Sequence, residues 1–198
     1  MESKKFLVFF TFIIISILNI NFSYALEPDV FVQSTVNRAS EALNNKYSKK
    51  EKIDKLKVIA SEAVDINGIG FYTLGAYRKN ISDDQIKQYN ILFKKYFLKS
   101  FASRLAEYSN PEIEVVSKKK LNKNYTMVSS ILVGTKQRPE VKIDWRIYTK
   151  NSKSPLIRDL IIEGLSLART QKEEFASIIQ SNDGDINALF ETLKEFIK

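Results

Sequence analysis

The stretch RDLIIEGLSLARTQKEEFASIIQ, residues 158–180, changes its periodicity halfway and thereby decides the fold class. Its first part is almost continuously apolar up to Ile162, which is typical of a buried strand. Gly164 permits a sharp exit from a sheet, because glycine reaches backbone conformations that other residues avoid. Thr170 and Glu173 then form a capping-box pattern that predicts the start of a helix. The stretch therefore predicts a final strand followed by a helix that folds back across one face of a sheet.

Upstream of this strand, the apolar residues recur at every second position, as half-buried strands require. The segments concerned begin at Ile113 and continue over residues 125–133 and 141–148. Short polar turns separate them, which predicts an antiparallel meander of about four strands. We interpret the lysines at 118–120 as a solvated loop between two of these strands.

The N-terminal half and the C-terminal end show helical spacing instead. Capping boxes begin at Ser48 and Ser82, a short helix is expected around residues 69–77, and a last helix is expected to start at Asp185. The longest helix carries a broad stripe of mostly aromatic residues: Tyr89, Phe93, Tyr96, Phe97, Phe101, Leu105 and Tyr108. The sequence thus predicts an α+β fold, in which a curved antiparallel sheet packs against helices from both ends of the chain.

Residues 1–25 have the features of a secretory signal peptide. A pair of lysines precedes an apolar core at residues 6–20, and Ser23 and Ala25 place small residues at the two positions that a signal peptidase reads. Cleavage after Ala25 would leave residues 26–198 as a single domain. The alternative is an uncleaved membrane anchor, although the apolar run is shorter than the roughly 20 residues of a spanning helix. We therefore expect an exported protein.

The composition excludes several classes of chemistry. The chain has neither cysteine nor histidine, so it lacks disulfides, thiol chemistry and the most common general base and zinc ligand. Its formal net charge is +8, which falls to +7 when Glu2, Lys4 and Lys5 leave with the signal segment. Basic proteins bind nucleic acid, anionic lipid or acidic proteins. Export and the scattered placement of the lysines argue against nucleic acid.

Carboxylates are the remaining candidates for catalysis. Asp144 and Asp159 lie on neighbouring predicted strands, and Asp65 ends a predicted helix. A buried pair could act as acid and base, so an exported isomerase or hydrolase with a cone-shaped α+β cavity is an alternative reading. Asp144, however, alternates with apolar residues and should face solvent. Since nucleophile-elbow and calcium-loop patterns are also missing, we predict no catalytic residue, no metal ligand and no cofactor.

The C-terminal third, residues 158–193, resembles the signature of the MlaC family, the periplasmic toluene-tolerance proteins that carry phospholipid between membranes. The matching residues are Asp159, Glu163, Gly164, Ser166, Leu167, Lys172, Phe175, Ile186, Leu189 and Leu193. Upstream, the family's long-helix pattern is matched by Leu74, Gly75, Tyr77, Arg78, Gln88, Phe93, Phe97, Phe101 and Leu105, and VKIDWRIY at 141–148 matches a family strand. Trp145 stands where tyrosine is usual and Tyr77 where tryptophan is usual, and residues 155–158 also depart from the family's pattern.

The resemblance implies a pocket between sheet and helices that holds phospholipid acyl chains, with the headgroup near solvent. It also implies a periplasmic shuttle between an inner-membrane ABC transporter with its substrate-binding ring and an outer-membrane lipoprotein–porin complex. An adaptor that binds only proteins is a third reading. The apolar residues fit a dry core as well as a pocket, and the inward faces of the second and fourth strands stay open. Our candidates for the pocket are Leu74, Phe93, Phe97, Phe101, Val115, Met127, Ile131, Ile143, Trp145, Ile147, Leu160, Ile162 and Leu167.

Overall fold

The computed structural model describes residues 25–198 except residue 137. The signal segment predicted for residues 1–25 therefore lies, apart from Ala25, outside the described residues. Within the described ranges, none of the helices combines the length and the hydropathy of a membrane span.

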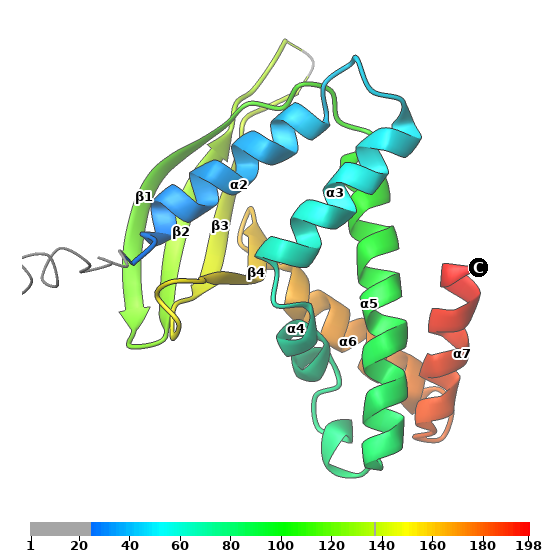
Figure 1. The fold of residues 1–198 in the computed structure, drawn as a ribbon. Helices are drawn as coiled ribbons and strands as arrows, with labels where there is room; N and C mark the ends of the chain where they lie inside the picture. Colours follow the sequence, from blue (N-terminus) through cyan, green and yellow to red (C-terminus); the bar gives the residue numbers. More distant parts are fainter. Residues whose placement is uncertain (1–24, 137) are drawn as a thin grey trace, which may run out of the picture.

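One antiparallel sheet forms the first layer of the fold, and its strands follow one another in chain order (Figure 1). The strands are β1 (Ile113–Asn122), β2 (Tyr125–Leu132), β3 (Val141–Tyr148), β4 (Leu156–Ile162) and β5 (Leu165–Ser166). This confirms the α+β class and the meander. The short β5 adds a strand beyond the four predicted.

The lysines at 118–120 belong to strand β1, so their assignment to a loop was wrong. Lys119 pairs with Met127 in the ladder between β1 and β2. Their charge suggested a loop, but lysines are also common on edge strands, where they discourage pairing with another chain. Lys118 also contacts Glu27 and Asp29, with its Nζ 2.6 Å and 2.8 Å from their carboxylate oxygens.

The helices form the second layer. They are α2 (Pro28–Ala42), α3 (Lys49–Ala63), α4 (Ile66–Thr73), the 3₁₀ turn η1 (Tyr77–Lys79), α5 (Asp83–Leu105), α6 (Leu167–Gln180) and α7 (Ile186–Ile197). The capping boxes at Ser48 and Ser82 are confirmed, and Asp185 caps α7. The predicted start of α6 at Thr170 was wrong, because the Ser166 side chain caps the helix one turn earlier. The short helix α4 also ends earlier than expected.

The glycine in the opening stretch serves a hairpin rather than a direct exit into the helix. Glu163 and Gly164 have φ values of 48° and 83°, which is the geometry of a two-residue hairpin turn. Ile162 consequently pairs with Leu165 across β4 and β5. Helix α6 then begins immediately after β5 and packs against β4.

In residues 25–198 as described, the interior is divided among three apolar clusters. Val32 and Val36 of α2 pack on the inner face of the sheet, while the largest cluster joins α4, α5, α6 and α7 around Tyr89 and Phe175. A third cluster, which includes Leu56, joins α2, α3 and α5. Figure 1 shows α2 lying across the sheet and α5 standing apart from it, with α3 between them. The sheet layer and the α5 layer therefore diverge.

Candidate functional site

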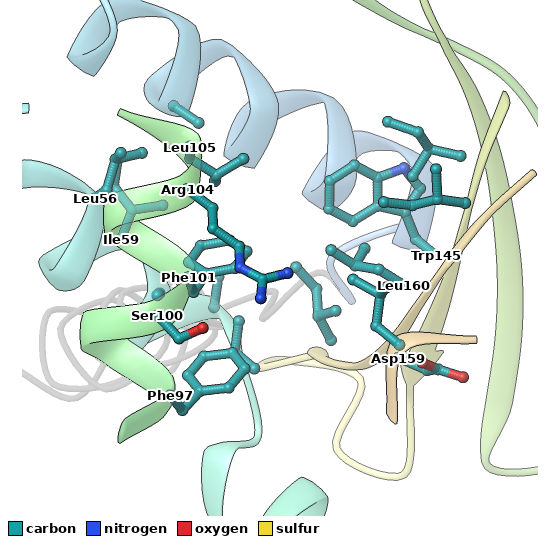
Figure 2. A pocket seen from close by; sticks show the side chains of 18 of the residues that line it. Leu56, Ile59, Phe97, Ser100, Phe101, Arg104, Leu105, Trp145, Asp159 and Leu160 are labelled. Atoms are coloured by element: carbon teal, nitrogen blue, oxygen red, sulfur yellow. The ribbon is translucent and has the colours of Figure 1, made fainter. Parts of the chain in front are cut away.

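A cavity of about 360 Å³ occupies the space between the diverging layers, within the usual size range of ligand pockets. Helices α2, α3, α5 and α6 and the inner face of the sheet all contribute to its wall. Figure 2 shows Phe97 and Phe101 of α5 on one side, facing Trp145 and Leu160 of the sheet on the other. The wall is predominantly apolar, so the cavity suits a hydrocarbon ligand.

Helix α5 presents two parallel rows to this cavity, because residues four apart lie on the same face of a helix. The apolar row consists of Phe93, Phe97, Phe101 and Leu105, and the polar row of Tyr96, Ser100 and Arg104. Successive rings of the apolar row are in contact: the ring centroids of Phe93 and Phe97 lie 6.1 Å apart and those of Phe97 and Phe101 5.5 Å. The first three residues of the apolar row thus form a continuous aromatic surface.

The sheet wall depends on a bulge in β4. Arg146 pairs with Asp159 but Ile147 pairs with Ile157, so Arg158 is the extra residue. A bulge changes which residues face inward along one strand. As a result Ile157 and Leu160, three positions apart, both line the cavity.

Eight of the thirteen predicted pocket residues line the cavity: Phe93, Phe97, Phe101, Ile143, Trp145, Leu160, Ile162 and Leu167. They come from α5, from the inner face of β3 and β4, and from the start of α6. The structure therefore brings together the aromatic stripe and the final strand, which are more than 50 residues apart in sequence.

The other five predicted residues are not part of the cavity wall. Met127 and Ile131 were placed on the wrong face, because the buried face of β2 is formed by the alternate residues from Thr126 to Leu132. Both faces of β2 contain apolar residues, and only pairing with its neighbours decides between them. Leu74 and Ile147 are fully packed in the core, at 1% and 0% exposure. Val115 packs beside the cluster beneath α2.

Several parts of the wall were not predicted, and two of them concern the helices. Helices α2 and α3 contribute Thr35, Val36, Ala39, Ser40, Leu56, Ile59, Ala60 and Ala63. Their helical spacing was visible in the sequence, and the small residues among them were the available signal for a wall that approaches a ligand closely. Arg104 was also missed, because a basic residue in the last turn of a helix usually interacts with the helix dipole alone.

Trp145 forms the end of the cavity along β3. Its indole Nε1 donates to Ser130 Oγ at 2.7 Å, and the ring is only 8% exposed. The next inward residue, Ile147, and the cross-strand neighbour Val128 are both 0% exposed and lie outside the wall. The part of the wall that β3 forms therefore ends at the indole.

The predicted carboxylates do not face the cavity in a form suited to catalysis. Asp144 lies on the outer face of β3, where it accepts from Ser129 Oγ at 2.5 Å. Asp159 is buried, and its carboxylate accepts from Ser166 Oγ at 2.7 Å and from the Ala168 amide at 3.0 Å. Figure 2 shows that carboxylate directed away from the cavity. Both groups therefore connect elements of the fold.

Asp65 also has structural partners. Asp65 accepts from Arg158 Nε at 2.6 Å and from the Gly68 amide at 2.9 Å at the start of α4. In the part of the chain that the structure describes, no group of three or more potential ligands is arranged to hold a metal ion.

The polar row of α5 continues onto α6. Tyr96 donates from its hydroxyl to Gln171 Oε1 at 2.8 Å, and Gln171 donates from Nε2 to Glu174 at 2.8 Å. Burial raises the pKa of the Tyr96 hydroxyl, and the negative charge of Glu174 raises it further, while the hydrogen bond to Gln171 and the positive charge of Arg104 lower it. One side of the cavity thus carries polar groups beside the aromatic surface.

The family model described as "MlaC protein" matches residues 33–195. The chain belongs to the MlaC family. The MlaC match covers the sheet, helices α3 to α6, two thirds of α2 and most of α7. Among solved structures, the fold of this MlaC-family chain is similar to that of a phospholipid-binding protein from Ralstonia solanacearum, determined in complex with a phospholipid.

The similarity to the Ralstonia protein has a TM-score of 0.72 at 18% sequence identity and covers 87% of this chain and 97% of the other. At this identity the likeness establishes a shared fold. No curated protein sequence matches the chain.

Proposed function

We propose that this MlaC-family chain is a phospholipid carrier that shelters acyl chains in the cavity between the sheet and α5. The observation that carries the proposal is the apolar cavity itself, with its aromatic row on one wall and Ile143, Trp145 and Leu160 on the other. The family match and the phospholipid-bound Ralstonia structure of the same fold support it.

Burial of hydrocarbon supplies the affinity. Each methylene removed from water is worth about 0.8 kcal/mol, so burial of about ten methylenes contributes about 8 kcal/mol. A carrier must match the bilayer it takes lipid from, and it does so only if its own wall is dry and apolar. The transfer requires no covalent step, and binding and release depend on contacts alone.

We also propose the cellular setting that the family resemblance implies. The N-terminal segment directs export to the periplasm and is cleaved after Ala25. The carrier then exchanges phospholipid with an inner-membrane ABC transporter and its substrate-binding ring, and with an outer-membrane lipoprotein–porin complex.

The decisive experiment measures lipid in the purified protein. The full-length chain is expressed in a bacterial host, purified from the cell envelope without detergent, extracted with organic solvent and analysed by mass spectrometry. We expect phospholipid at a near-stoichiometric amount. Folded protein without lipid would instead support an adaptor that binds only proteins.

A matched pair of variants locates the lipid. Ile143 lines the cavity from β3, whereas Ile131 lies on the outer face of the neighbouring strand β2. Ile143→Lys should remove bound lipid from soluble, folded protein, because an ammonium group in the cavity is costly beside hydrocarbon. Ile131→Lys adds the same charge to the same sheet and should retain lipid. Equal lipid content in both variants would contradict the assigned cavity.

A further inference from the structure

The cavity wall carries a basic residue, Arg104, that forms no ion pair with another described residue. Arg104 lies on the polar row of α5, and Figure 2 shows its guanidinium extending from the helix into the space between Phe101 and Leu160. Among the described residues, no carboxylate lies within 4.0 Å of it, although twelve such ion pairs occur elsewhere in the described residues. The residue is exposed, so its charge is hydrated at the mouth of the cavity and available to a ligand.

The neighbours of Arg104 define an amphipathic track along α5. Ser100 lies one turn before Arg104 on the same row, and the apolar row with Phe97 and Phe101 lies directly beside this polar row. A molecule that lies along this helix would place hydrocarbon on the rings and a polar, anionic group beside the guanidinium. A phospholipid has this arrangement of parts.

We propose that Arg104 binds the phosphate of the lipid cargo, and this inference rests on the proposed carrier function. The guanidinium matches a phosphate diester because its planar fork donates two parallel hydrogen bonds. Ser100 provides a further hydroxyl donor on the same side. Every phospholipid carries this phosphate, so Arg104 selects phospholipid over neutral lipid without choosing among headgroups.

Glu174 is the acidic residue that faces the same space from α6. Its carboxylate accepts from Gln171, and no lysine or arginine among the described residues pairs with it. Its charge repels phosphate, so the phosphate is held on the α5 side of the mouth. Glu174 is therefore a matched control: a charged, exposed residue of the same cavity whose carboxylate does not bind phosphate.

The test compares two lipids with identical chains. Protein expressed from the full sequence is stripped of lipid and offered an equimolar mixture of dioleoylphosphatidylglycerol and dioleoylglycerol, and native mass spectrometry measures the ratio bound. We expect the wild type to prefer the phospholipid, and Arg104→Gln to lower that preference by about tenfold, which corresponds to loss of a charge-assisted contact at an exposed position. Arg104→Lys should fall between them, and Glu174→Gln should keep or increase the preference.

The outcomes separate the two proposals. If the wild type takes up neither lipid, the carrier function fails and this inference fails with it. If all proteins bind both lipids in one ratio, the carrier function stands and the phosphate site at Arg104 is refuted. A third arm uses inorganic phosphate alone. If phosphate stabilises the wild type but not Arg104→Gln against heat, and the wild type shows no preference for the phospholipid in the mixture, the site binds free phosphate and the lipid assignment is overturned.

Discussion

Replacing Trp145 by valine should lengthen the acyl chains that the cavity accepts. Along β3 the wall ends at this indole, and the residues behind it, Ile147 and Val128, are fully buried. Valine suits a strand, and the substitution removes about seven heavy atoms of packed volume, or space for about three methylenes. The new space continues the cavity towards the core beneath α2.

The magnitude follows from exchange with a bilayer. Each methylene that leaves the bilayer costs about 0.8 kcal/mol and regains that amount only if it enters the cavity. Up to the length that the cavity holds, longer and shorter chains should therefore compete equally. Beyond that length, occupancy should fall about fourfold for each further methylene that stays exposed.

The assay offers vesicles containing equal amounts of phosphatidylglycerols with graded saturated chains, and native mass spectrometry compares bound lipid with vesicle lipid. In the wild type, occupancy should start to fall at one chain length. In Trp145→Val it should start to fall about three methylenes later, counted on the acyl chain that reaches the indole. Trp145→Phe keeps most of the ring volume but loses the hydrogen bond to Ser130, so it should lower the free energy of unfolding by about 1 kcal/mol without changing the chain length at which occupancy falls. A fall that starts at the same length in wild type and Trp145→Val would refute the assignment of the indole as the end of the cavity.

Other substitutions test the framework around the cavity. Asp159→Ala should lower the free energy of unfolding by about 3 kcal/mol in urea titrations, because it removes a buried carboxylate that holds the start of α6. An unchanged midpoint and slope of the titration would show that this carboxylate does not stabilise the fold. Gly70→Ala should cost about 1–3 kcal/mol in the same titration and reduce lipid content, because the added Cβ would lie 2.7 Å from Phe93 Cδ1, and that ring lines the cavity. Lys118→Gln should raise the pKa of Asp29, followed by NMR titration, since the hydrogen bond from this lysine is the main cause of its lowered value. The contact with Lys118 stabilises the folded protein above the ordinary carboxyl pKa, and this stabilisation is lost as the pH falls through the lowered pKa of Asp29. The wild type should therefore be more stable than Lys118→Gln at neutral pH but not in acid. Parallel profiles of stability against pH for the two proteins would contradict this.

Much of the local structure was predictable because its causes are local. Capping residues at Ser48, Ser82 and Asp185 satisfy amide groups within their own first turns, so three helix starts were readable. The start of α6 was misplaced because two serine or threonine caps were available, and β5 and the Asp159 anchor decided for Ser166. The β1 lysines were misread because the ladder to β2 overrides their polarity.

The site was less predictable than the elements that build it. The row of rings on α5 and the inward face of β3 followed from periodicity alone, and both line the cavity. The bulge at Arg158 and the inward face of β2 depend on strand register, which is a property of two strands together. Arg104 lines the cavity only because the last turns of α5 lie across the opening from the sheet, which the sequence of the helix does not show.

The amino-acid sequence alone determined the α+β class, the order of the elements and the MlaC resemblance, because each of these rests on spacing along the chain. Only the tertiary structure decided which apolar residues close a core and which surround an opening. Apolar side chains that fill a core and those that line a cavity have the same composition and periodicity. What separates them is the divergence of α5 from the sheet, and that depends on how distant segments pack against one another.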